Sequence, residues 1–274
     1  MFPQTPSLAL FTIAAALLAP PACPAHGTFH ERMAQLAARI ERAPADAAAH
    51  FELARLFCQH GDWALALGAA DAADALQPGA FATDLVRGEA QLGLGHAASA
   101  RGALNRFLAS QPQHAPALVL RARATTALDG PEAALADYRA ATECPALVQA
   151  DHFREAAGAL EAAGRTDDAI NVLARGLARL GPDPTLLRDA LALEEATGRV
   201  DDALARIACL EAAAPRREPW MARRARLLAA TRPAESRAAW AKLLRHLDSL
   251  PNLERGLPEL RAIAAEGRAA LESR

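Results

Sequence analysis

The sequence predicts an all-helical chain built from repeated pairs of antiparallel helices, and two observations support this. Glycines recur about every 34 residues between apolar stretches of helical period, at Gly61, Gly95, Gly130, Gly164 and Gly198, with one adjustment of a residue at Gly130. Alanine and leucine dominate the apolar residues, whereas aromatic residues make up only 4% of the chain. Small apolar side chains favour closely packed helices over sheets. Self-similarity at a fixed interval of this length is typical of a solenoid.

Each repeat carries a turn, a small residue and a stop at regular places. A glycine after the last turn of the first helix adopts the left-handed cap conformation at no steric cost, so the chain reverses there. An alanine follows, with apolar residues four and seven positions beyond it on the same stripe of the second helix. A proline then ends the unit. The alanines are Ala66, Ala100, Ala134, Ala169 and Ala203, and the prolines are Pro78, Pro112, Pro145, Pro182 and Pro215.

This pattern resembles the tetratricopeptide repeat, a helix hairpin that stacks into a right-handed superhelix. The first unit matches the signature at His50, Leu53, Ala54, Phe57, Gly61, Ala66, Ala70, Ala73 and Pro78. The match covers roughly residues 47–216, and a degenerate sixth unit without the turn glycine follows from Trp220 to Leu247. The resemblance implies a right-handed superhelical solenoid of about 14 helices. Together with the leader described below, it identifies the chain as an exported bacterial tetratricopeptide repeat protein.

The predicted organisation has four parts: a signal peptide over residues 1–25, a capping helix over 26–46, the solenoid over 47–250 and a second capping helix over 251–274. The solenoid holds about five clear repeats and the degenerate sixth. Met33, Leu36 and Ile40 fall at helical spacing in the first cap, and Leu253 to Leu271 form the second. A stack of repeats exposes an apolar face at each end, which such helices cover.

The first residues indicate export. An apolar run from Leu8 to Leu18 precedes a small, proline-rich stretch, and this run is shorter than the roughly 20 residues that a membrane-spanning helix needs. Cleavage after Ala25 leaves His26 as the mature N-terminus. Lipidation at Cys23 is an alternative. We therefore expect a periplasmic or secreted protein, or a lipoprotein that associates with a membrane only if Cys23 is lipidated.

Charge and motifs give no indication of an enzyme. The 30 basic and 32 acidic residues nearly cancel, which provides no argument for nucleic acid. Phosphate loops, nucleophile elbows and zinc-protease motifs do not occur in the sequence. The aspartate pairs Asp167-Asp168 and Asp201-Asp202 begin second helices, where we expect them to cap backbone amides and favour the helix dipole. No cofactor is expected.

Cysteines and histidines leave one alternative open. Cys58, Cys144 and Cys209 are scattered without a C-x-x-C motif, so we interpret them as buried small residues in helices. His26 and His30 lie close to the predicted mature N-terminus. An exposed amine and two imidazoles there would bind a transition metal, whereas a solvated chain end would bind none.

The resemblance also implies where a partner binds, because the first helices of successive repeats line a concave face. Arginines on this face favour an anionic or extended peptide through bidentate contacts, unless they are only solvated positions. The predicted groove residues are Phe51, Arg55, Leu85, Glu89, Val119, Arg123, Arg154, Arg188 and Met221. We therefore expect a non-enzymatic scaffold of the bacterial cell envelope that binds a partner protein or peptide. The alternative is a metal-binding or envelope-tethered lipoprotein that acts through its mature N-terminus.

A second candidate surface is the basic segment from Arg216 to Arg245. Nine basic residues there accompany only two acidic residues, Glu218 and Glu235. Such a segment forms a solvated surface, or it meets anionic lipid heads, an acidic partner or nucleic acid. A solvated surface is the interpretation that the sequence favours, because the segment lacks aromatic residues beyond its tryptophans.

Overall fold

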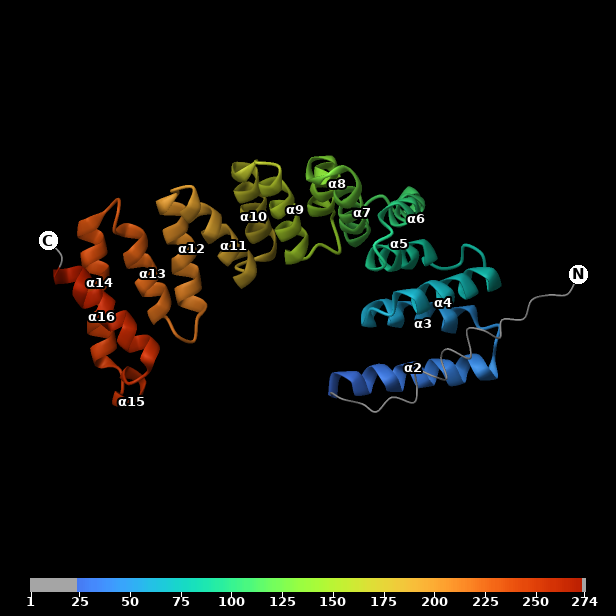
Figure 1. The fold of residues 1–274 in the computed structure, drawn as a ribbon, viewed down its shortest axis with the longest axis horizontal. Coiled ribbons are helices and arrows are strands. Elements are labelled where there is room, and N and C mark those ends of the chain that lie inside the picture. The colour runs from blue at the N-terminus through green and yellow to red at the C-terminus, as the bar shows by residue number, and fades with distance from the viewer. Residues whose placement is uncertain (1–23, 273–274) are drawn as a thin grey trace, which may run out of the picture. The chain divides into compact units, whose positions relative to one another are not determined.

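The computed structural model describes residues 24–272, and within this range every regular element is a helix (Figure 1). The all-α class is therefore confirmed. The described residues divide into two compact units, with the boundary between Val148 and Gln149. The helices of the first unit are α2 (Pro24–Arg42), α3 (Ala47–His60), α4 (Trp63–Leu76), α5 (Thr83–Gly93), α6 (Ala97–Ser110), α7 (Ala115–Asp129) and α8 (Pro131–Glu143). Those of the second are α9 (Ala150–Ala162), α10 (Thr166–Leu180), α11 (Pro184–Ala196), α12 (Val200–Ala213), α13 (Glu218–Leu228), α14 (Pro233–Ser249), α15 (Asn252–Arg255) and α16 (Pro258–Glu272).

The predicted turn glycines end first helices as expected. Gly61 has φ 87° and ψ 11°, a left-handed conformation that glycine adopts without a Cβ clash. Its N–H donates to the carbonyl of Cys58, and the N–H of Asp62 donates to the carbonyl of Phe57. This pair of bonds satisfies carbonyls at the helix end and turns the chain back. Gly130 differs, since its φ is 90° and its ψ 169°, and α8 begins directly after it at Pro131.

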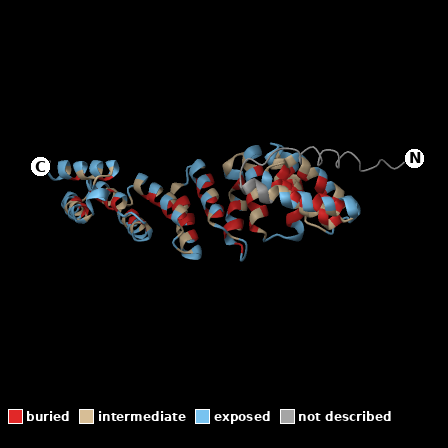
Figure 2. Cartoon of the chain, turned by 90° about the horizontal axis from the view of Figure 1, so that it is seen from below, coloured by how far each residue is buried: buried red, intermediate tan, exposed pale blue. Residues whose placement is uncertain are grey.

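The stripe of small residues packs as the repeat pattern predicts. Ala66, Ala100, Ala134, Ala169 and Ala203 each have 0% of their surface exposed. Each lies on the second helix of its pair, and α3 packs on α4, α5 on α6, α7 on α8, α9 on α10 and α11 on α12. In Figure 2 the buried residues lie on the helix faces turned toward neighbouring helices. Burial of apolar surface between paired helices therefore holds each unit together.

A helix packs at each end of the repeats, and the C-terminal segment differs in detail from the single capping helix that we expected. In α2, which packs on α3, Met33 and Ile40 are almost fully buried. The C-terminal segment is not one helix from Leu253, because α15 ends before Gly256 and α16 begins at Pro258. A proline lacks the N–H that a continuing helix needs and restricts the residue before it, so it starts a new helix here. As a result, Leu253 is 87% exposed, whereas Leu260 and Gly267 are the buried residues of α16.

The paired aspartates do not act as side-chain caps, contrary to expectation. They lie in the first turns of α10 and α12, where their charge favours the helix dipole, but neither helix has a side-chain hydrogen bond at its N-cap. Asp167 instead contacts Arg199 and Asp201 contacts Arg232, each arginine lying at the start of the next second helix. Asp168 pairs with Arg165.

The interpretation of the cysteines as buried residues in helices is wrong in part, because Cys209 is not buried and Cys144 lies just after the end of α8. Cys58 and Cys144 are buried, but Cys209 is exposed on α12. Its place is on a helix face that no other element of the second unit covers. Among residues 24–272, no helix is both long and apolar enough to cross a membrane. Cys23 lies outside the described residues, and the expected cleavage site after Ala25 falls in the first turn of α2.

Candidate partner-binding face

The first unit brings three predicted groove residues together. Arg55 lies on α3, Glu89 on α5 and Arg123 on α7, and α5 packs against both α3 and α7. Both arginines are exposed, whereas Glu89 is half-buried. Phe51 and Leu85 lie one turn before Arg55 and Glu89 on the same helices. We call Phe51, Arg55, Leu85, Glu89 and Arg123 the groove patch.

Two opposing effects act on the pKa of Glu89, the carboxylate of the groove patch. Burial raises the pKa of Glu89, because the charged carboxylate loses hydration, and the positive charges of Arg123 and Arg55 act in the opposite direction. Burial is the largest of these effects. The positive charges of Arg55 and Arg123 therefore both act on the half-buried carboxylate of Glu89.

An aromatic pair forms the apolar part of the patch. The rings of Phe51 and Phe81 stack with their centroids 5.1 Å apart and their planes at 23°. Phe81 comes from the loop between α4 and α5, and both rings are half-buried. Stacked rings of this kind offer a large and rigid contact surface. The repeat pattern did not predict Phe81, because loop residues carry no helical period.

A thiol lies buried near the groove patch and takes no part in it. Cys58 donates to the carbonyl of Val86 with its sulfur 3.8 Å from the oxygen. Burial raises the pKa of Cys58 to about 12, and the negative charge of Glu89 adds to this shift. A thiol is nucleophilic only as the thiolate, so Cys58 is chemically inert at neutral pH.

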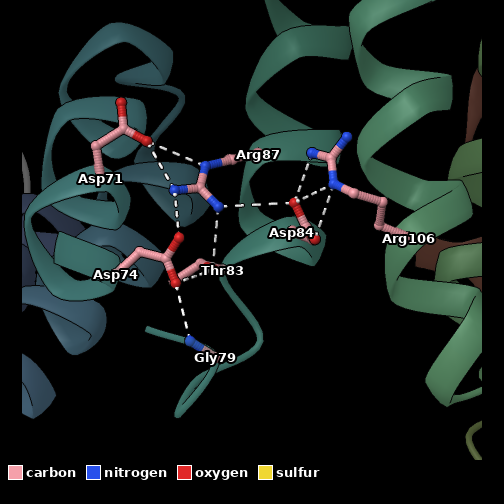
Figure 3. Close-up of polar contacts among 7 residues, drawn as sticks. All are labelled: Asp71, Asp74, Gly79, Thr83, Asp84, Arg87 and Arg106. Carbon is pink, nitrogen blue, oxygen red and sulfur yellow. Dashed lines mark hydrogen bonds and ion pairs between the residues drawn. The ribbon is translucent and has the colours of Figure 1, made fainter. Parts of the chain in front are cut away.

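A network of charged side chains holds the loop that carries Phe81 (Figure 3). Arg87 on α5 donates to Asp71 at 2.9 and 3.0 Å and to Asp74 at 3.1 Å, both on α4. Asp74 in turn accepts from the backbone N–H of Gly79 at 3.2 Å. That bond, followed by the guanidinium of Arg87, lowers the pKa of Asp74 despite its partial burial. These contacts tie both ends of the loop to the helices beside it.

The network continues to α6 and borders a polar cavity. Arg106 binds Asp84 with both Nε and Nη2, the shortest contact being 2.7 Å. The cavity of about 460 Å³ beside it is lined by Phe81, Arg87 and Arg106, among others. Since the lining arginines already bind aspartates, we interpret the network as support for the loop. Sequence reasoning missed it, although Asp71 and Asp74 share one helix face at a spacing of three residues.

Two predicted groove residues do not reach the surface. Val119 is 2% exposed and Met221 is 6% exposed, so neither offers its side chain to a ligand. In α7 the buried residues surround most of the helix, because it packs against α5, α6 and α8. Met221 belongs to a core cluster with Trp240 and Leu243 on α14.

The predicted arginines of the second unit differ from each other. Arg154 on α9 binds Asp189 on α11 at 2.6 Å and Asp151 at 3.2 Å, so its charge is already balanced within the fold. These carboxylates raise the pKa of Arg154. Arg188 is exposed and forms no ion pair with any residue of the described range. A ligand of this unit would have to displace Asp189 before it reached Arg154.

Four of the nine basic residues in the basic segment pair with acids from other helices. Carboxylates of the described chain pair with several of its arginines: Arg223 with Glu195, Arg224 with Glu211, Arg226 with Glu266, and Arg232 with Asp201. The guanidinium of Arg223 also lies 5.9 Å from the ring centroid of Trp220. These partners lie between 13 and 40 residues away in the sequence, so the local charge count overstated the positive charge of the surface.

The histidines near the N-terminus do not form a described metal site. His30 packs edge-on against Phe29, with ring centroids 5.3 Å apart, and the side chain of His26 lies outside the described part of the chain. Within residues 24–272 no group of three or more histidine, cysteine, aspartate or glutamate side chains is placed to hold a metal ion. His246 has a specific partner that the sequence did not indicate, because its Nε2 lies 2.8 Å from Oε1 of the buried Glu218.

Comparisons with known proteins agree with this architecture. No family model and no curated protein sequence matches the chain. Among solved structures, the C-terminal part of a tetratricopeptide repeat protein from Cytophaga hutchinsonii is 13% identical, with a TM-score of 0.57, covering 81% of this chain and 93% of the other. PilF of Pseudomonas aeruginosa is 16% identical, with a TM-score of 0.55, covering 82% and 99%.

A tetratricopeptide repeat protein from Parabacteroides merdae is 15% identical, with a TM-score of 0.50, and the match covers 95% of this chain and 99% of the other. Identities at this level establish a shared architecture and carry no information about ligands. The helix pairs, the glycine turns and these structural neighbours together show that the chain has the fold of tetratricopeptide repeat proteins.

Proposed function

We propose that the chain is a non-enzymatic scaffold that binds an extended acidic segment of a partner protein on the groove patch of its first unit. The observation that carries the proposal is the position of Arg55 and Arg123 on helices that flank the half-buried Glu89. Paired guanidinium groups bind carboxylates in a bidentate manner. In the proposed complex, a carboxylate of the partner binds these exposed guanidinium groups.

The spacing of the patch supports an extended ligand. Phe51 and Arg55 lie one helical turn apart, as do Leu85 and Glu89, so an apolar position and a charged position alternate on adjacent helices. In an extended peptide, residues two apart lie on one face at about 7 Å. An acidic residue and an apolar residue with one residue between them therefore meet an arginine and the Phe51–Phe81 pair at the same time.

The chain is proposed to act in the cell envelope. This rests on the pattern of residues 1–25, an apolar run followed by small residues and prolines. A fusion of residues 1–40 to a reporter enzyme that is active only outside the cytoplasm tests it. Activity supports export. Activity unchanged by replacing Leu8 to Leu18 with polar residues, or no activity at all, would refute it.

The experiment for the groove patch is site-specific crosslinking in intact cells. A photo-reactive amino acid replaces Leu85, which is half-buried in the patch, and in a matched control it replaces the exposed Ala133 on α8. A partner that crosslinks from position 85 alone supports the proposal. Equal crosslinking from both positions, or none from position 85, contradicts it.

Charge reversal then tests the role of the arginines. The double variant Arg55→Glu, Arg123→Glu should lose the crosslinked partner. A control with the same change in charge, Arg237→Glu, Lys242→Glu, alters two exposed cations of α14 that pair with no described carboxylate. This control should retain the partner, which separates local recognition from a general effect of net charge.

A further inference from the structure

A cleft with an apolar floor lies between α14 and α16, in the second unit. Its volume is about 270 Å³. Leu247 and Leu260 are buried at its base, and Leu244 and Ala264 are half-buried beside them. These residues come from α14 and α16, which pack against each other.

The rim of the cleft carries positive charge that the fold does not neutralise. Arg255, Arg261 and Arg268 line it together with a single acid, Asp248. In the described range, Arg261, Arg268 and Asp248 form no ion pair with one another or with any other residue. The rim therefore has an excess of two positive charges beside an apolar surface.

Glu266, which lies between Arg261 and Arg268 in the sequence, already forms an ion pair with another residue. Glu266 accepts from Arg226 on α13 at 2.7 and 2.5 Å, and this pair lowers the pKa of Glu266. The ring of Trp240 lies 6.0 Å from the same guanidinium. Glu266 is thus held toward α13 and does not balance Arg261 or Arg268.

The size and spacing of the cleft indicate the kind of ligand. Pockets that enclose whole small molecules usually have volumes of about 300 to 1,000 Å³, so this cleft suits one or two apolar side chains presented from outside. Arg261 and Arg268 are separated by seven residues on α16, which corresponds to about 10.5 Å along the helix. A second helix with acidic residues seven positions apart matches that interval.

We propose that this cleft docks an acidic amphipathic helix of a partner protein. Apolar side chains of that helix enter the cleft over Leu247 and Leu260, and two of its carboxylates, seven residues apart, bind Arg261 and Arg268. Both halves of this recognition are established modes, a helix packed in an apolar groove and bidentate pairing of arginine with carboxylate. The proposal is independent of the groove patch, since it concerns the second unit and a helical ligand.

The test measures binding of a designed peptide to the full-length chain by fluorescence anisotropy. The probe is a labelled amphipathic helix of about 18 residues, which gives five turns, with two glutamates seven positions apart and leucines between them. A second probe replaces both glutamates with lysine. The protein variants are Arg261→Glu, Arg268→Glu and the matched control Arg237→Glu, Lys242→Glu, which changes the charge equally on exposed positions outside the cleft.

The expected result is binding of the acidic probe that weakens about tenfold or more in the cleft variant and changes little in the control, because two ion pairs are replaced by repulsion. Ala264→Leu, which fills the floor without changing charge, should also weaken binding. The groove variant Arg55→Glu, Arg123→Glu should bind the probe as the wild type does.

Three results would overturn the proposal. The first is absence of binding to the acidic probe. The second is an equal loss in the cleft variant and in its control, which would indicate general electrostatics. The third is binding through Arg261 and Arg268 to vesicles of phosphatidylglycerol but not to the peptide, since the cleft would then meet a lipid surface. Circular dichroism confirms that each variant keeps its helices.

Discussion

Asp167 at the start of α10 lies 2.6 Å from the guanidinium of Arg199, the residue that precedes α12. The same relationship recurs one repeat later, where Asp201 lies 2.8 Å from Arg232. The first aspartate of each pair in the second unit therefore connects the turn of one repeat to the turn of the next.

These connecting ion pairs should contribute little to stability. Asp167 and Asp201 have 78% and 80% of their side-chain surface exposed, and ion pairs in water are typically worth about 0 to 1 kcal/mol. Asp167→Asn and Asp201→Asn should each lower the free energy of unfolding in urea by less than about 1 kcal/mol, and the difference should diminish at high salt. A loss above about 2 kcal/mol that persists in high salt would contradict this.

Two glycine substitutions in the first unit should have opposite effects. A Cβ at Gly88 would lie 2.5 Å from Cγ of Leu104, which is fully buried, so Gly88→Ala should destabilise by about 1 to 3 kcal/mol through overpacking. A Cβ at Gly102 on α6 meets nothing within 4 Å. Gly102→Ala should therefore stabilise the helix by up to about 1 kcal/mol. Denaturant unfolding measures both, and a shift of the same sign in the two variants would count against the packing described.

The buried Glu194 should make the second unit less stable as pH rises. It is 1% exposed; one oxygen accepts from Arg206 at 3.2 Å, and the other has no hydrogen-bond partner in the described chain. Burial raises its pKa, opposed by Arg206 and Arg199 and assisted by Asp202. Because the folded-state pKa exceeds the unfolded one, the folded state binds more protons between the two values. This contribution is fully present below the unfolded pKa and is lost as pH rises through the folded pKa.

Glu194→Gln should remove that dependence. The free energy of unfolding of the variant, relative to that of the wild type, should be higher at pH 7 than at acidic pH. The reason is that the amide carries no charge that burial penalises. Unfolding in urea at a series of pH values from the ordinary glutamate range to neutrality measures it. A difference between variant and wild type that does not change with pH would refute the assignment.

Cysteine reactivity should distinguish the buried and exposed thiols. In a Cys23→Ser background, iodoacetamide should modify Cys209 first, because it is exposed. Cys58 should react only after unfolding, since its pKa is raised to about 12 and it is buried. Mass spectrometry of peptides after timed labelling gives the rates. Modification of Cys58 as fast as that of Cys209 would show that α3 and α5 do not pack as described.

Much of the fold was predictable because it depends on local features that repeat. A glycine that tolerates a left-handed turn and an alanine that permits close packing act in the same way in every unit, as Gly61 and Ala66 show. The division into two units was not predictable. Its linker runs from Cys144 to Gln149 and includes Leu147 with φ 60°, and nothing in the repeat pattern sets this linker apart.

The candidate site was predictable only in part. Repeat positions identified Arg55, Glu89 and Arg123, which the packing of α3, α5 and α7 brings together. The same positions wrongly included Val119, because burial on α7 depends on how many neighbours surround the helix. Ion pairs between residues far apart in the sequence could not be predicted either. Arg154 pairs with Asp189, 35 residues away, because the packing of α9 on α11 brings the two side chains together.

The most direct test of the groove patch compares two substitutions that should act in opposite directions. With the photo-reactive residue at position 85, Arg55→Glu, Arg123→Glu should reduce the crosslinked partner about tenfold, because charge reversal repels its carboxylates. Glu89→Gln should increase it, because the carboxylate that competes with the ligand for both arginines is lost. Yields that stay unchanged in both variants, or fall in both, would contradict the binding of an acidic segment at this face.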